Sequence, residues 1–158
     1  MRHWLRHAIT TTEEARQIIQ ARRADRQAGT GFSFAVLRAD ADGAAGDLVG
    51  GVSIRRRDGE AASGDVGYWV TAPWRGQGIA PRALNAVCEW AFRLPQHPPL
   101  EQLELIHAVG NHASCRVADK TGFALAAILP PLLPEFPGDG HLHILMSDAI
   151  ADGACRVL

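Results

Sequence analysis

The stretch that decides the fold is residues 66–80, VGYWVTAPWRGQGIA, in which an apolar run meets a glycine-rich turn and then a helical pattern. The run up to Thr71 has the β-branched and aromatic residues typical of a strand and ends just before Pro73. From Ile79 to Phe92, apolar residues recur at helical spacing. Pro81 falls in the first helical turn, where a missing backbone N–H is harmless. The sequence therefore predicts a strand, a tight turn and a helix in direct succession.

A turn of this kind is a candidate site for a phosphate or pyrophosphate group. The first backbone N–H groups of a helix have no partner within it, and the helix dipole adds positive charge there. Gly76 and Gly78 place no Cβ between the backbone and such an anion. A dinucleotide fingerprint would need glycine where Pro81 stands, and a P-loop would need a lysine after the turn, so both are excluded. Two glycines alone also fit a tight turn without any ligand.

The residues before this stretch predict a helix followed by strands. Two overlapping capping boxes, Thr10 with Glu13 and Thr11 with Glu14, precede an amphipathic pattern that runs to about Gln27. Strands are predicted over residues 32–37, 48–56 and 65–71, the first two as an antiparallel hairpin.

The residues after it predict a strand over 103–109, a short helix over 112–120 capped by Gly122, and strands over 123–129 and 141–148. A proline-rich loop separates the last two strands. Hairpins thus precede a single strand–helix–strand unit. This order predicts a mixed α+β or α/β sheet, not a doubly wound one.

Composition bounds the partners and the compartment. The 158 residues suit one domain, and 16 Lys and Arg against 17 Asp and Glu favour neither nucleic acid nor a membrane surface. The run Arg55–Arg57 fits a solvated strand edge or turn. Cys88, Cys115 and Cys155 lack paired spacing, which is typical of a reducing compartment, and no apolar run reaches membrane-spanning length. We therefore expect a cytoplasmic protein. A monomer and a homodimer are both compatible with the sequence.

Two motifs resemble one known family. Residues 75–80, RGQGIA, match the R/Q-x-x-G-x-G/A signature of the GNAT superfamily of acetyltransferases. Residues 111–123, NHASCRVADKTGF, resemble the N-x-x-S-x-x-V/A-x-x-K-x-G-F segment of its RimJ/RimL-type branch. The resemblance extends over about residues 32–148 and implies one GNAT domain over 1–158, with a mostly antiparallel central sheet flanked by helices. That branch usually opens with a further strand and helix, which we expect to be absent here.

The resemblance implies transfer of an acetyl group from acetyl-CoA to a primary amine by direct attack in a ternary complex. The amine would belong to a protein N-terminus or to a small molecule. The backbone N–H of Val70 would stabilise the tetrahedral intermediate, and Ser114 would donate to the departing thiolate. Asn111 would contact pantetheine, although it is also a good N-cap, and both roles are compatible. The implied contacts with acetyl-CoA are made by Val70, Arg75, Gly76, Gln77, Gly78, Ile79, Ala80, Asn111 and Ser114.

The acceptor amine must lose a proton before it attacks, so a general base is expected. Asp65 is the best-placed carboxylate, because it alternates with Gly67 and Trp69 onto one strand face. A solvated aspartate at the start of a strand is the competing interpretation. Glu135 in the proline-rich loop is a further candidate base.

His141 and His143 share one face of the last strand and are candidates for lining the acceptor site. An H-x-H pair is also typical of a metal site, but no third ligand is suitably spaced, so we expect no metal and two half-buried histidines. Cys115 is interpreted as a buried helix cysteine, not as a nucleophile that carries the acetyl group.

The alternative function is a non-catalytic acyl-CoA-binding module of the same fold. It would keep the cofactor turn and lack a working acceptor site, and it would bind acetyl-CoA without transferring acetyl to any amine. A nucleotide-phosphate enzyme that uses the same glycine turn is a third possibility, disfavoured because neither fingerprint is complete.

Overall fold

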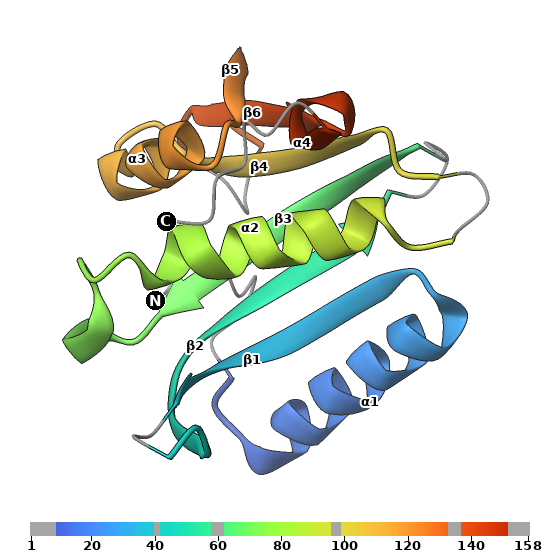
Figure 1. The fold of residues 1–158 in the computed structure, drawn as a ribbon, viewed down its shortest axis with the longest axis vertical. Helices are drawn as coiled ribbons and strands as arrows, with labels where there is room; N and C mark the ends of the chain where they lie inside the picture. Colours follow the sequence, from blue (N-terminus) through green and yellow to red (C-terminus); the bar gives the residue numbers. More distant parts are fainter. Residues whose placement is uncertain (1–8, 40–41, 58–61, 96–98, 133–136, 152–158) are drawn as a thin grey trace.

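The computed structural model describes residues 9–39, 42–57, 62–95, 99–132 and 137–151. A six-stranded sheet with the order β1-β2-β3-β4-β6-β5 organises the chain (Figure 1). The helices are α1 (Thr12–Ala28), α2 (Ile79–Phe92), α3 (His112–Lys120) and α4 (Asp148–Ala151), with a short 3-10 helix at Ala72–Trp74. The strands are β1 (Gly31–Ala39), β2 (Ala45–Arg56), β3 (Ser63–Val70), β4 (Gln102–Ala108), β5 (Ala124–Leu129) and β6 (Gly140–Met146).

The sheet confirms the predicted fold class. Neighbouring strands in the described residues pair antiparallel, except that β3 and β4 run parallel. The helix Ile79–Phe92 begins and ends where the apolar spacing predicted it. Thr121 is the C-cap of α3, and Gly122 follows it with a φ of 78°. The sequence did not predict α4.

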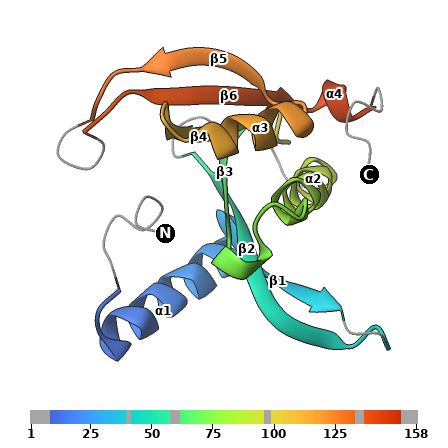
Figure 2. The same cartoon turned by 90° about the vertical axis from the view of Figure 1, so that its left-hand side faces the viewer.

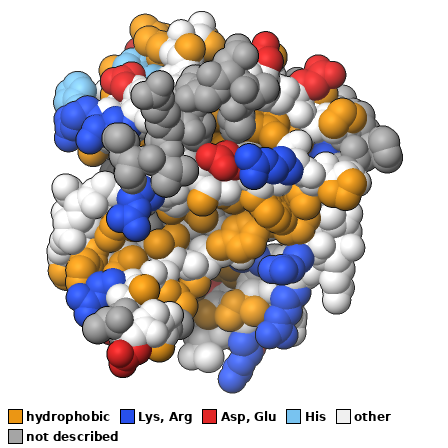
Figure 3. Space-filling view, viewed as in Figure 1, with side chains coloured by type: hydrophobic (Ala, Val, Ile, Leu, Met, Phe, Trp, Pro, Cys, Tyr) orange, Lys and Arg blue, Asp and Glu red, His pale blue; other side chains and the backbone are white. Residues whose placement is uncertain are grey.

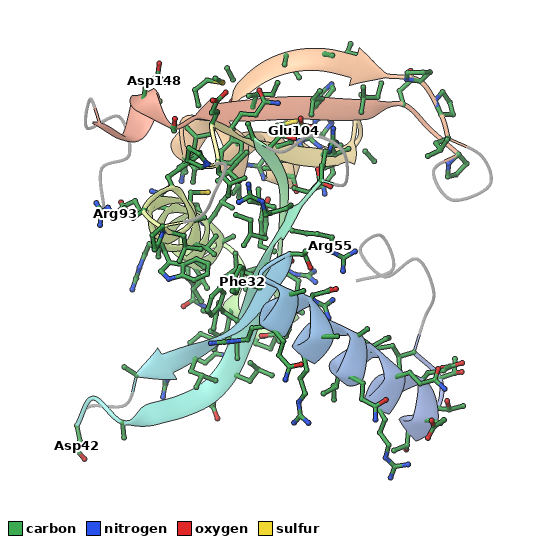
Figure 4. The ribbon with its side chains drawn as sticks, turned by 90° about the vertical axis from the view of Figure 1, so that its right-hand side faces the viewer. Phe32, Asp42, Arg55, Arg93, Glu104 and Asp148 are labelled. Atoms are coloured by element: carbon green, nitrogen blue, oxygen red, sulfur yellow. The ribbon has the colours of Figure 1, made fainter. Side chains whose placement is uncertain are left out.

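Helix α2 packs on β2 and β3, and the main core continues from there to buried residues of β4 and β6. The buried apolar side chains of α2 recur at helical spacing, and they are Leu84, Val87, Cys88 and Ala91. Phe32 and Phe34 of β1 contact the ring of Trp90 edge-on, with centroids 4.9 and 5.1 Å apart, and Figure 4 shows Phe32 beside α2. Hydrophobic side chains also gather on the surface over α2 and its neighbouring strands (Figure 3). The position of α2 against the sheet is therefore fixed by apolar packing.

Helix α1 forms by local signals and lies against β1. Of the two possible capping boxes the structure forms that of Thr11 and Glu14: each side chain accepts from the other's backbone N–H at 3.1 Å. Gly29 ends the helix with a φ of 72°. No residue of α1 is buried, and Ile19 is 51% exposed. The apolar face of this amphipathic helix is therefore only slightly covered by the rest of the protein. The described residues hold no strand before α1.

Strands β3 and β4 separate soon after they meet. They pair only between Ser63–Asp65 and Gln102–Glu104. Beyond that point β3 continues against β2, and β4 continues against β6, so the two strands diverge (Figure 2). We call the region where residues 66–70 of β3 and residues 105–108 of β4 no longer pair with each other the opening.

An ion-paired arginine holds the closed end of these strands together. Arg57 contacts Asp65 of β3 at 3.0 Å and Glu104 of β4 at 2.8 Å, and the side chain of Glu104 is only 5% exposed. Arg55 pairs with Asp25 of α1 at 3.2 Å. The arginine run thus lies at the end of β2 with Arg55 exposed, as predicted, and two of its side chains also bridge separate elements.

Candidate active site

The N-terminus of α2 has the features of an anion site. Gly76 and Gly78 have φ values of 77° and 74°, a region that L-residues rarely adopt. A Cβ built on either glycine would meet no described atom within 4 Å, so backbone conformation and not crowding requires glycine there. Gly78 is the N-cap, without a side-chain cap, and the first turn of α2 holds no acidic residue. The N–H groups of Ile79 and Ala80 are therefore available to a ligand.

The end of β3 directs backbone groups of Val70 toward the opening. The N–H of Thr71 donates to the carbonyl of Val49 on β2 at 2.9 Å. Because successive residues of a strand point their N–H groups to opposite sides, the N–H of Val70 points away from β2 and toward the opening. The carbonyl of Val70 accepts from Nε of Arg75 at 3.1 Å. Arg75 thus fixes the start of the glycine turn to the end of β3.

Ser114 lies in the first turn of α3 and is held from two directions. Its backbone N–H donates to Oδ1 of Asn111 at 3.2 Å, which makes Asn111 the N-cap of α3. Its Oγ accepts from the hydroxyl of Tyr68 at 3.0 Å, and Ser114 is only 4% exposed. Since Tyr68 belongs to β3 and α3 follows β4, this hydrogen bond spans the opening.

Tyr68 was missed by the sequence analysis. Burial raises the pKa of its phenol, an effect larger than the lowering by its hydrogen bond to Ser114. A raised pKa keeps the phenol protonated near neutral pH, so it remains a donor. The alternation of side chains along a strand could have pointed to Tyr68. On the strand that leads into the glycine turn, Tyr68 lies on the face opposite to Asp65 and Gly67.

The fold does not place Asp65 beside the hydrogen-bonded pair of Tyr68 and Ser114. It lies at the closed end of β3, where its carboxylate pairs with Arg57 at 3.0 Å. Tyr68 is three residues further along the strand and on the opposite face. Asp65 as a base therefore stays a prediction, and its observed contact is the ion pair with Arg57. Glu135 lies outside the described residues.

The histidines of the last strand do share one face, and they are joined by side chains from two other elements. His107 of β4 lies opposite His141 in the strand register, and Cys115 of α3 lies 3.5 Å from Nδ1 of His141. His143 is 3% exposed and so is buried rather than half-buried. Burial lowers the pKa of His107, with smaller contributions from the two other histidines. The expectation that no third ligand accompanies the H-x-H pair was wrong, because sheet pairing supplies His107.

Comparison with known proteins identifies the class. The family model of the acetyltransferase (GNAT) domain matches residues 1–124. The ribosomal-protein-serine acetyltransferase of Escherichia coli (strain K12) is 26% identical over 144 residues, which cover 91% of this chain and 74% of that enzyme.

Solved structures share the fold, among them the following two. A RimL alpha-N-protein acetyltransferase in complex with coenzyme A has a TM-score of 0.74 at 21% identity, and the match covers 92% of this chain and 82% of that one. Mycobacterium smegmatis RimJ in complex with CoA-disulfide has a TM-score of 0.72 at 23% identity, with coverage of 92% and 71%.

The chain therefore belongs to the GNAT acetyltransferase family and is an acyl-CoA-dependent N-acetyltransferase. Its similar proteins include the Escherichia coli enzyme above, and its fold is shared with enzymes named RimL and RimJ. The described residues form no helix long and apolar enough to span a membrane.

Proposed function

We propose that the chain transfers the acetyl group of acetyl-CoA to the α-amino group of a protein N-terminus. The observation that carries this proposal is the opening itself. Strand β3 borders the opening on one side and leads through the glycine turn to the N-terminus of α2, which has no side-chain cap. The hydrogen bond from Tyr68 to Ser114 spans the opening. A long, thin cofactor with a diphosphate at one end and a thioester at the other fits this arrangement.

The cofactor would bind mainly through the backbone. The N–H groups from Gln77 to Ala80 would hold the pyrophosphate, and the positive φ of the two glycines between Arg75 and Ile79 shapes that cradle. The pantetheine arm would then run along the opening, where β3 presents the N–H groups that it does not donate to β2. Asn111, at the far side of the opening, would contact this arm while it caps α3.

The chemical step would use two donors at the thioester, the second of which is held by Tyr68. The N–H of Val70 would donate to the carbonyl oxygen as negative charge develops on it during attack by the amine. The C–S bond would break as the intermediate collapses to the amide, the proton that the amine nitrogen gains in the attack would pass to solvent, and the Ser114 hydroxyl would donate a hydrogen bond to the departing thiolate. Because Oγ of Ser114 already accepts from Tyr68, its own proton is free for that second partner.

An α-amino acceptor fits both the site and the relatives. An α-amino group has a pKa of about 7.7–8.0, so roughly a tenth or more is neutral near pH 7, whereas lysine has a pKa of about 10.4. Such an amine needs little help from a base, which agrees with the ion pairing of Asp65. The Escherichia coli relative is named for acetylation of a ribosomal protein, and the RimL structure for α-N-protein acetylation.

The test is acetyl-CoA turnover against matched peptides. One peptide has a free N-terminus and no lysine, the second has a blocked N-terminus and one lysine, and a polyamine and an amino sugar complete the set. We expect acetylation of the first peptide only, with kcat/KM rising as its amine deprotonates. Exclusive acetylation of the small amines would overturn the acceptor assignment. Binding of acetyl-CoA with no transfer to any amine would favour the non-catalytic module.

A further inference from the structure

Four side chains from three elements converge on one point behind the first turn of α3. They are His107 of β4, Cys115 of α3, and His141 and His143 of β6, and their candidate ligand atoms all lie within 4.8 Å of one another. Strands β4 and β6 lie side by side with α3 packed against them (Figures 1 and 2). We propose that this cluster, called the His₃Cys cluster below, binds one zinc-like divalent cation with four protein ligands.

Unsatisfied nitrogens in the interior support a cation. His107 and His143 are 6% and 3% exposed. Among the described residues, Nε2 of His107 and both ring nitrogens of His143 are buried without a hydrogen-bond partner. Buried polar atoms are almost always paired, because leaving one unpaired is unfavourable. A bound metal would satisfy a lone pair on each ring.

His107 is held in the tautomer that a metal ligand needs. Its Nδ1 lies 3.0 Å from the backbone carbonyl of Ala108, which can only accept a hydrogen bond. The proton therefore resides on Nδ1, and Nε2 carries the lone pair. A backbone carbonyl that orients a histidine through its second nitrogen is the usual outer-shell arrangement of histidine ligands.

The donor set selects the class of cation. Three imidazole nitrogens and one thiolate suit a borderline or soft metal such as Zn²⁺, and carboxylate-preferring Mg²⁺ or Ca²⁺ would be disfavoured. In a tetrahedral zinc site the ligand atoms are about 3.3–3.7 Å apart. Cys115 Sγ and His141 Nδ1 already lie 3.5 Å apart, and the other pairs, all within 4.8 Å, need a contraction of at most about 1.5 Å.

Four protein ligands leave no open position, so the site would be structural. It would connect β4 and β6 to the helix that carries Ser114, without the cation touching the thioester. The inference does not depend on the proposed acceptor. Zinc binding and peptide acetylation can succeed or fail separately.

The experiment uses the full chain after dialysis against a chelator. Titration with Zn²⁺, followed by calorimetry, should give one equivalent per chain, and Co²⁺ should give the visible bands of a tetrahedral site with a thiolate charge-transfer band. At a hundredfold excess of Zn²⁺ over Kd, the Tm should rise by roughly 5–10 °C. Cys115→Ser and His141→Gln, both at half-buried positions, should each weaken zinc binding by more than about 100-fold, beyond the loss from outer-shell changes.

His112→Gln is the matched control, because His112 is an exposed histidine of α3 outside the cluster. It should bind zinc like the parent chain. Acetyl-CoA binding by each variant, together with its circular dichroism, reports whether the variant is folded. Failure of the folded parent chain to bind stoichiometric Zn²⁺ or Co²⁺ would overturn the proposal. So would a Cys115→Ser variant that keeps both the affinity and the charge-transfer band.

Discussion

Replacing Tyr68 with Phe tests whether the contact between β3 and α3 contributes to acetyl transfer. The change removes the hydroxyl that donates to Ser114 at 3.0 Å and keeps the ring that packs against the core. One such hydrogen bond contributes about 0.5–1.5 kcal/mol net. If the bond directs the Ser114 proton toward the sulfur, a loss of about 1.4 kcal/mol from the transition state lowers kcat about tenfold. The KM for acetyl-CoA should change little, because its main contacts are proposed at α2.

Ser114→Ala should be more severe. It removes the proposed donor and the hydrogen bond with the half-buried Tyr68, a net loss of about 0.5–1.5 kcal/mol of stability. Because both residues act through one proton, the double variant should turn over no more slowly than Ser114→Ala alone. Steady-state release of CoA thiol at saturating acetyl-CoA measures these differences.

Thr121→Val is the control for the loss of a buried hydroxyl on α3. Thr121 is 1% exposed and donates to the carbonyl of Val117 at 2.8 Å, at the opposite end of the helix from Ser114. It should lower stability without lowering kcat. The reasoning is refuted if Tyr68→Phe matches the parent kcat while Ser114→Ala lowers it, or if the two losses add in the double variant.

Three further predictions follow from the turn, the ion pairs and the helix cap. Gly78→Ala should cost about 1–2 kcal/mol through its φ of 74° and weaken acetyl-CoA binding in calorimetry, whereas Gly78→Asn, which tolerates that conformation better, should lose less. Arg57→Met should lower the free energy of unfolding in urea by about 2–3 kcal/mol, because the buried carboxylate of Glu104 loses its ion-pair partner. Arg55→Met removes an exposed ion pair and should lower that free energy by less than about 1 kcal/mol. Hydrogen bonds from the backbone of Thr10 and Thr11 lower the pKa of Glu14 in the folded state. The ionised carboxylate therefore stabilises the fold at pH values above its ordinary pKa of 4.5, and this stabilisation is lost as pH falls through the folded pKa. A Glu14→Gln variant should lack that part of the acid dependence in thermal unfolding; an unchanged acid profile would contradict this.

The parts of the fold that the sequence predicted depend on short-range signals. Glycines at 76 and 78 adopt the positive φ that only glycine accepts readily, and α2 follows them at Ile79. The capping residue Thr11 and the terminating Gly29 bound α1 in the same way. In each case the deciding residues are within a few positions of the feature that they specify, so the pattern is complete in a short window.

The parts that were missed depend on which strands become neighbours. His107 and His141 are 34 positions apart, and only the pairing of β4 with β6 places them opposite each other. The sequence predicted a solvated Arg57 because its buried partner Glu104 belongs to a strand that follows much later in the sequence. Spacing along a sequence cannot reveal such contacts, since the order of strands in a sheet is set by packing of the whole domain.

The first turn of α3 links the proposed catalytic group to the His₃Cys cluster. Successive residues of a helix point about 100° apart, so Ser114 can face Tyr68 of β3 while Cys115 faces His141 of β6. Ser114 and Ala118 are the buried residues of this nine-residue helix, which therefore gains little from apolar burial. Its rotation about its own axis depends instead on polar contacts in the first turn. A change on the Cys115 side would thus alter the direction of the Ser114 hydroxyl without touching the opening between β3 and β4.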